Sequence, residues 1–233
     1  MRKAFHEELD RVAETLVEMT HLAASAMNRA TTALLDADIH LADSVIAADA
    51  EIDSRRAELD LMSFDLLARQ QPVATDLRVI VTSMRMSSDI ERMGDLARHV
   101  AKVARLRYPE SAVPAELRAT ILQMGQVAER IVEKAGSVIA ARDLVAAQEI
   151  ERDDDAMDEL HRELIARVTG GGWQHGTEAA VDITLLARYY ERFADHAVSV
   201  GHRVIWLVTG ELDPRSESSH EDAEDDAPVL HRG

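Results

Sequence analysis

The sequence predicts an all-α fold in which long helices pack as bundles. Three observations support this fold class. Apolar residues recur at spacings of three and four, aromatic residues make up only 3% of the 233-residue chain, and all five prolines stand where the helical pattern pauses. No long segment alternates as a strand would. A chain of this length can form one domain or two of about 110 residues each.

Six long helices are expected along the chain. They are placed at residues 3–35, 38–70, 75–107, 115–141, 143–169 and 177–209. Helices of about 30 residues are about 45 Å long. Helices of that length joined by short turns form antiparallel bundles.

The breaks around the first three helices have local causes. Asp36-Ala37-Asp38 offers an N-cap for the second helix, and Gln71-Pro72 stops it. Thr75-Asp76 can cap the third helix and place a negative charge at its N-terminus. Tyr108-Pro109 ends that helix.

The second half of the chain is punctuated in the same way. Pro114 suits the first turn of the fourth helix, and Asp143 can cap the fifth. Gly170-Gly171-Gly172 ends the fifth helix, and Gly210 stands where the sixth should finish. Residues of the sixth helix that alternate steps of four and three predict a buried seam: Ile183, Ala187, Tyr190, Ala194, Ala197, Gly201, Val204 and Val208.

The charge and composition of the chain exclude several classes of function. A formal charge of −17, from 43 acidic and 26 basic residues, repels a nucleic-acid backbone, so we expect no nucleic-acid partner. No segment approaches the roughly 20 apolar residues of a membrane span, so we expect a cytoplasmic protein without membrane insertion. The absence of cysteine excludes disulfides and thiolate metal sites.

A short motif occurs twice, one hundred positions apart. Residues 91–95 read ERMGD in the third predicted helix, and residues 191–195 read ERFAD in the sixth. Three helices followed by three helices with this motif predict an internal duplication. We therefore expect one repeat at 1–110 and a second at 111–210. The acidic segment 211–233 has almost no apolar residues, so we expect it to be a disordered tail.

Each predicted repeat carries two pairs of carboxylates spaced four residues apart. The pairs are Asp49 with Asp53 and Glu91 with Asp95 in the first repeat, and Asp154 with Asp158 and Glu191 with Asp195 in the second. Side chains four apart share one face of a helix. Convergent carboxylates repel one another unless a proton or a cation lies between them. Each repeat is therefore a candidate site for a hard cation such as Mg²⁺, Mn²⁺, Ca²⁺ or iron.

An acidic chain also produces such pairs by chance, so a second interpretation stays open. The carboxylates can form an ordinary solvated face on which Arg92 and Arg192 make surface ion pairs. The protein would then be a metal-free helical scaffold. Recurrence of the pairs at equivalent places in both repeats favours the cation site.

Two long stretches resemble signatures of the PhoU family, in the form found in actinobacteria. They are residues 71–78 (QPVATDLR) leading into residues 89–95 (DIERMGD), and residues 186–197 (LARYYERFADHA). The resemblance covers nearly the whole chain and implies two tandem three-helix bundles. It also implies that the carboxylate motifs can hold iron or zinc. Ala194 departs from the glycine that the family usually has there, but alanine is also small.

The resemblance implies a regulator of phosphate uptake and not an enzyme. The implied partners are a PhoR-type sensor histidine kinase and the ATPase subunit of the Pst phosphate transporter, and the implied assembly is a homodimer. Proteins of this family help to keep the phosphate-starvation regulon silent when phosphate is plentiful.

An enzyme remains a rival interpretation. Ferritin-like di-metal oxidases also use long helical bundles, and they need a Glu-x-x-His sequence on two helices. Glu18 and His21 supply this spacing once, and we find no second helical copy.

Overall fold

Six long helices and one short 3₁₀ turn make up residues 2–211, which are the residues that the computed structural model describes. They are α1 (Arg2–Asp36), α2 (Ile39–Gln70), α3 (Thr75–Arg107), η1 (Ala115–Leu117), α4 (Arg118–Ala141), α5 (Leu144–Thr169) and α6 (Gly176–Thr209). The predicted all-α fold is confirmed, and most helix ends agree within one residue. The fourth helix differs because the 3₁₀ turn precedes it.

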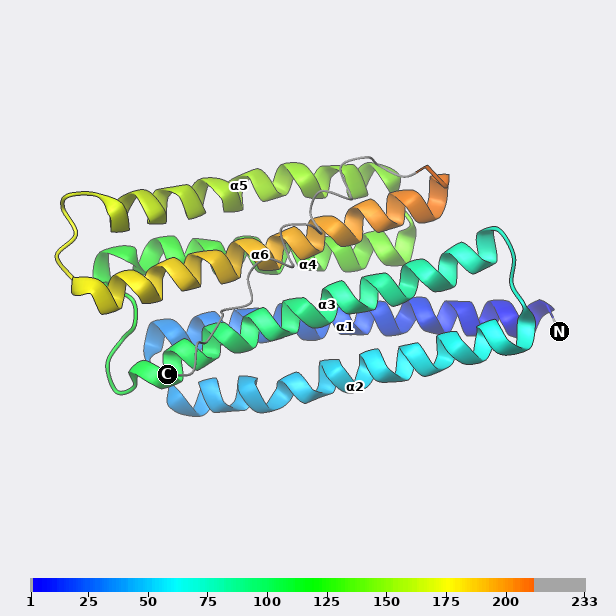
Figure 1. Cartoon of the computed structure of the whole chain (residues 1–233), viewed down its shortest axis with the longest axis horizontal. Coiled ribbons are helices and arrows are strands. Elements are labelled where there is room, and N and C mark those ends of the chain that lie inside the picture. The colour runs from blue at the N-terminus through cyan, green and yellow to red at the C-terminus, as the bar shows by residue number, and fades with distance from the viewer. Residues whose placement is uncertain (1, 212–233) are drawn as a thin grey trace, which may run out of the picture.

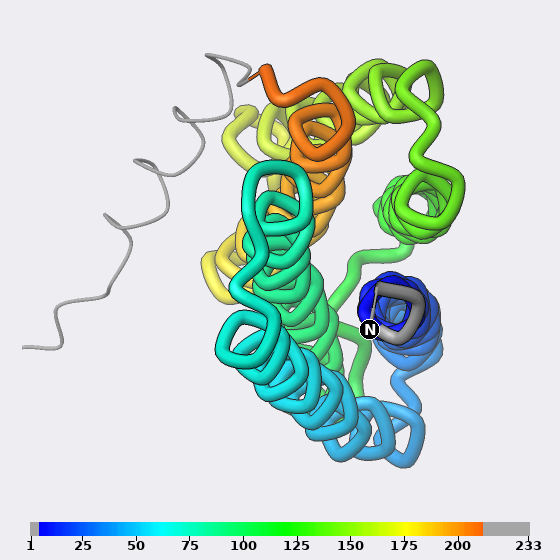
Figure 2. Tube along the Cα trace, turned by 90° about the vertical axis from the view of Figure 1, so that its right-hand side faces the viewer, coloured from blue at the N-terminus to red at the C-terminus, as the bar shows by residue number. Residues whose placement is uncertain are grey.

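The helices form two tandem three-helix bundles that lie side by side (Figures 1 and 2). Helices α1, α2 and α3 pack on one another, and α4, α5 and α6 do the same. The bundles meet where α1 packs on α4 and α3 packs on α6. The two helices that carry the repeated motif, α3 and α6, therefore lie next to each other. Figure 1 shows that they run in opposite directions. None of the described helices is long and apolar enough to cross a membrane.

The predicted caps of α2 and α5 are confirmed. Asp38 accepts hydrogen bonds from the backbone N–H groups of His40 and Leu41. Asp143 accepts them from the N–H groups of Val145 and Ala146. Each carboxylate satisfies N–H groups that have no partner within the helix, and its charge favours the positive end of the helix dipole.

Two expectations at the ends of α3 and α6 are wrong. Thr75 is the first residue inside α3 and does not cap it, because the carbonyls of Val73 and Ala74 accept hydrogen bonds from the first N–H groups instead. Val208 does not belong to the buried seam of α6, since its side chain is 39% exposed. Leu207, one position earlier, is buried in its place. The predicted tail, 211–233, lies outside the described residues except for Glu211.

A buried contact among three helices joins the two bundles near the C-terminal end of α1. Tyr190 of α6 is completely buried, and its hydroxyl lies 2.8 Å from the hydroxyl of Thr31 in α1. Gly125 of α4 packs on the same threonine, and a Cβ added there would lie 2.7 Å from the Thr31 Oγ1. A side chain at position 125 would therefore push α4 away from α1.

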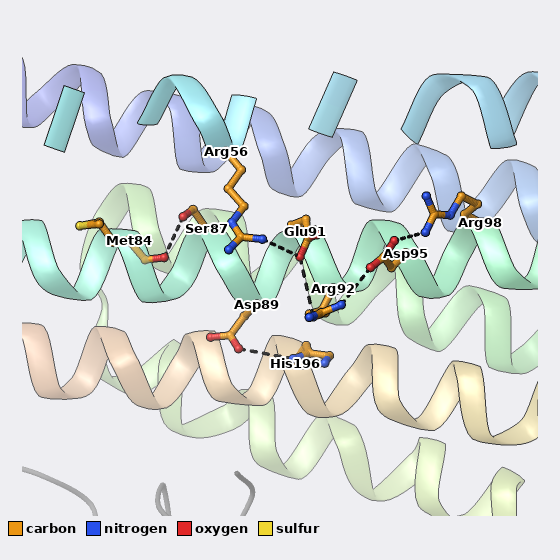
Figure 3. Close-up of polar contacts among 9 residues, drawn as sticks. All are labelled: Arg56, Met84, Ser87, Asp89, Glu91, Arg92, Asp95, Arg98 and His196. Atoms are coloured by element: carbon orange, nitrogen blue, oxygen red, sulfur yellow. Dashed lines mark hydrogen bonds and ion pairs between the residues drawn. The ribbon is translucent and has the colours of Figure 1, made fainter. Parts of the chain in front are cut away.

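Two buried ion pairs join α3 to α6. Asp89 accepts a hydrogen bond of 2.5 Å from Nε of Arg203, and the His196 ring lies 3.4 Å from its other oxygen (Figure 3). Farther along the interface, Arg107 donates two hydrogen bonds of 2.5 and 3.0 Å to Asp182. Burial opposes the ionisation of Asp89, but its contacts with His196 and Arg203 outweigh burial and lower its pKa.

We expect Asp89→Ala to lower the free energy of unfolding by about 3 kcal/mol, because it removes a largely buried carboxylate that pairs with both Arg203 and His196. The matched control is Asp43→Ala. That change removes an exposed ion pair with Arg105 and should cost less than about 1 kcal/mol. Urea unfolding of the full chain measures both. Equal losses in the two variants would contradict a stabilising role for the buried pair.

Candidate functional site

The first carboxylate set lies where α2 packs on α3. It consists of Asp49, Asp53, Glu91 and Asp95. Asp49 is only 5% exposed, whereas Asp53 lies at the solvent edge. The two helices approach closely at Gly94, where an added Cβ would lie 2.8 Å from Cδ1 of Ile52 and 3.3 Å from a carboxylate oxygen of Asp49. The glycine of the ERMGD motif therefore brings the carboxylates of the two helices together.

Arg98 neutralises two members of the first carboxylate set from within α3. Its Nη1 lies 2.5 Å from Oδ2 of Asp49, and its Nη2 donates to Asp95. The guanidinium thus connects a carboxylate of α2 with one of its own helix. Its planar fork presents several N–H donors, so it can bond two carboxylates at once.

Two further arginines pair with the same set (Figure 3). Arg56 of α2 lies 3.1 Å from Oε2 of Glu91. Arg92 lies 3.8 Å from that oxygen and 3.2 Å from Oδ2 of Asp95. The first carboxylate set is therefore surrounded by positive charge that the chain itself provides.

Electrostatic interactions within the first set oppose its arginines. Burial, together with the charges of Asp53 and Asp95, raises the pKa of Asp49 even though Arg98 acts in the opposite direction. Burial likewise raises the pKa of Glu91, and Asp95 adds to the effect. The carboxylates of α2 and α3 thus lie close enough to repel one another.

The second carboxylate set lies where α5 packs on α6, and it has much less compensation. It consists of Asp154, Asp158, Glu191 and Asp195. Among the ion pairs of residues 2–211, the one that involves this set joins Arg188 to Glu191, with Nη1 lying 2.7 Å from both carboxylate oxygens. Oδ1 of Asp154 is buried and has no hydrogen-bond partner. A buried carboxylate oxygen without a partner is energetically costly.

The proton affinities of the second set reflect this lack of compensation. Burial, followed by the charges of Asp195, Asp158 and Glu191, raises the pKa of Asp154 to about 7. The side chain of Asp195 is exposed to solvent, but the surrounding protein atoms still reduce the hydration of its carboxylate. This burial, with the charge of Glu191, raises its pKa to about 6 although Arg188 opposes the change. Asp154 and Asp195 therefore titrate near neutral pH, where the second set can hold a proton or attract a cation.

The structure brings each predicted set of four onto a pair of packed helices but does not arrange it as a finished metal site. In the part of the chain that is described, no group of three or more His, Asp or Glu side chains could hold a metal ion as the side chains lie. Metal binding by these eight residues stays a prediction.

The ferritin-like alternative receives no support from the positions of its residues. Glu18 and His21 are both exposed on α1, and Glu18 lies 3.7 Å from Nη1 of Arg55. Such an oxidase would need this pair to project into the core of the bundle.

The sequence interpretation missed Arg56 and Arg98 as partners of the first set. The spacing of Asp95 and Arg98 by three residues is a local signal that could have predicted their contact. The contact of Arg98 with Asp49 joins two helices and has no local signal.

The fold and the carboxylate pairs define a class of protein: duplicated three-helix bundles with an acidic i, i+4 motif on the third helix of each half. The chain belongs to the PhoU family, since the PhoU domain matches residues 16–104 and again residues 121–204. The resemblance seen in the motifs is thereby confirmed over most of the chain.

Relatives and solved structures agree with this assignment. The phosphate-specific transport system accessory protein PhoU homolog 2 of Mycobacterium tuberculosis is 50% identical over 210 residues, which are 90% of this chain and 99% of that protein. Homolog 1 from the same species is 44% identical over 219 residues, 94% of this chain and 99% of that protein. The crystal structure of PhoU from Pseudomonas aeruginosa gives a TM-score of 0.79 at 30% identity, covering 89% of this chain and all of the other. The structure from Streptococcus pneumoniae gives 0.81 at 25% identity, covering 90% and 99%.

We expect Asp154→Asn to stabilise the protein at pH 8 in the presence of a chelator. The pKa of Asp154 in the folded state, about 7, is above the ordinary value of 3.8. The folded state therefore binds this proton more tightly than the unfolded state does. The resulting contribution to the free energy of unfolding is complete below about pH 4 and is lost as the pH rises to about 7. The asparagine should add about 1–2 kcal/mol at pH 8, since solvent screens part of the full effect.

The gain should be smaller at pH 5, where the folded state still holds the proton. Thermal melting at both pH values measures the difference, and Glu159→Gln, on the exposed face of α5, is the control. A destabilised Asp154→Asn protein at pH 8 would show that this carboxylate is compensated in solution.

Proposed function

We propose that this protein is a cytoplasmic negative regulator of phosphate uptake and of the phosphate-starvation regulon. The observation that carries the proposal is its similarity to accessory proteins of the phosphate-specific transport system, at 50% identity over 90% of this chain. Both PhoU domains are present and packed together.

The regulation is proposed to work through protein contacts. One partner is the ATPase subunit of the Pst transporter, and the other is a PhoR-type sensor histidine kinase, so that the protein links the state of the transporter to the activity of the kinase. The long helices present a rigid surface with a large negative charge. Such a charge speeds encounters with basic surfaces and makes them sensitive to salt.

We further propose that the protein is a homodimer without catalytic activity. The titratable groups that gather between its helices are carboxylates, of which some pair with arginines and others lie close to one another. Carboxylates paired with arginines can hold neighbouring helices in place, but they do not provide an activated nucleophile. The names of its relatives describe accessory proteins, which agrees with this role.

A metal ion is proposed to take part in the second repeat. The fit of the residues supports it, because Asp154 has a buried oxygen without a partner and the second carboxylate set pairs with Arg188 alone among the described cations. Carboxylate oxygens accept Mg²⁺, Mn²⁺ or iron, and zinc is a further possibility that the family suggests. A cation would draw the side chains together by rotation about their χ angles. It would supply the positive charge that stabilises the ionised carboxylates and the contact of α5 with α6.

Capture of the two partners tests the regulatory proposal. The full chain is immobilised and offered the Pst ATPase subunit or the cytoplasmic region of the kinase, at high and at low phosphate. We expect both partners to be retained, with several-fold weaker retention when salt rises from about 50 to about 300 mM. An unrelated acidic helical protein is the control. Failure to retain either partner at any phosphate concentration would contradict the proposal.

A further inference from the structure

One of the positions at which the two repeats differ lies three residues after the carboxylate motif. Three residues after Asp95 the first repeat has Arg98, and three residues after Asp195 the second repeat has Val198. The offset of one hundred that relates the two motifs also relates these two positions. A basic side chain in one repeat thus corresponds to an apolar one in the other.

In the first repeat this position delivers a cation between the two helices. The guanidinium of Arg98 contacts Asp49 and Asp95 at once, and its side chain is 28% exposed. Asp49 is 5% exposed, so water contributes little to the stability of its charge. Arg98 occupies the place between α2 and α3 where a metal ion would have to bridge the same carboxylates.

The covalent attachment of Arg98 strengthens this neutralisation. A tethered group reaches its partner at a high effective concentration, whereas a metal ion must be supplied from solution. A metal ion that entered the first set would also displace the guanidinium from Asp49 and leave it partly buried without a partner. Leaving the guanidinium of Arg98 unpaired in a partly buried place costs free energy. A metal ion that binds the second repeat displaces no such group.

Among the described residues of the second repeat, no arginine or lysine contacts Asp154 and Asp195 as Arg98 contacts Asp49 and Asp95. Val198 packs against the apolar core. Asp154, which corresponds to Asp49 in the duplication, keeps a buried oxygen with neither a hydrogen bond nor an ion pair among the described residues. The buried Oε2 of Glu91 in the first set also lacks a hydrogen bond, but it lies 3.1 Å from Arg56. Arg188 contacts Glu191 from one turn earlier in α6, and no hydrogen bond or ion pair among the described residues joins it to Asp154 or Asp195.

We propose that Arg98 is the built-in counter-cation of the first carboxylate set and that the wild-type protein therefore takes up metal in its second repeat only. The inference rests on the metal-binding part of the proposed function. The two similar halves then differ in the source of their counter-charge: the first repeat carries it in Arg98, and the second takes it from solution.

An exchange of the two residues tests this division. Arg98→Val removes the built-in cation, Val198→Arg supplies one to the second repeat, and the double variant exchanges them. The probe is Mn²⁺, whose binding is counted on the full chain from the loss of the electron paramagnetic resonance signal of the free ion. Circular dichroism verifies that each variant is folded.

The expected results differ for each variant. The wild type should bind Mn²⁺. Asp154→Asn should abolish this binding, and Asp49→Asn should leave it unchanged. Arg98→Val should gain an additional equivalent of Mn²⁺, and adding Asp49→Asn should remove that gain. Val198→Arg should lose the wild-type binding. Arg98→Lys keeps the positive charge and should bind as the wild type does.

The inference and the proposed metal function fail in different ways. Loss of half of the bound Mn²⁺ in Asp49→Asn, with no gain in Arg98→Val, would overturn the inference and leave metal binding in place. No binding by the wild type but a gain in Arg98→Val would support the role of Arg98 and contradict metal uptake by the second repeat. No binding by any folded variant, Arg98→Val included, would overturn both. These comparisons stand even where Val198→Arg does not fold.

Discussion

The repulsion between carboxylates on facing helices is the constraint on which the functional part of this structure depends. Small residues at the contacts, such as Gly94, let α2 and α3 approach until their acidic side chains affect one another. The close packing that stabilises each bundle therefore creates an electrostatic cost where the acidic helices meet. Each repeat must offset that cost, and the two repeats differ in how they do so.

The helices that carry the carboxylates also hold the two bundles together. Asp89 and Glu91 are two residues apart on α3, so they face different neighbours: Asp89 pairs with Arg203 of α6, and Glu91 pairs with Arg56 of α2. A shift of α3 along its axis would disturb both contacts. The first carboxylate set and the interface between the repeats therefore share α3, which has polar contacts on more than one side.

The sequence predicts the helices well because their signals are local. Asp38 and Asp143 act within one turn of the chain, and the periodicity of the buried residues needs no partner. The cap at Thr75 was misplaced because backbone carbonyls compete for the same N–H groups. The pairing of the acidic residues followed from duplication, but the contact of Arg98 with Asp49 spans 49 positions and depends on how two helices are rotated against each other. Rotation of that kind is a tertiary property, so spacing along one helix does not determine it.

Divergence of side chains between the two repeats can give a duplicated protein two unlike halves while the fold stays the same. Arginine and valine at positions 98 and 198 both sit on half-buried helix faces, so either is compatible with the bundle. The first repeat keeps the counter-charge of Arg98 at all physiological pH values, because a guanidinium does not deprotonate there. The second repeat contains Asp154 and Asp195, with pKa values of about 7 and about 6, so its charge changes with protons or cations near neutrality. A partner that touches both repeats would then meet one surface with a permanent counter-charge and one whose charge changes with pH or with bound cations.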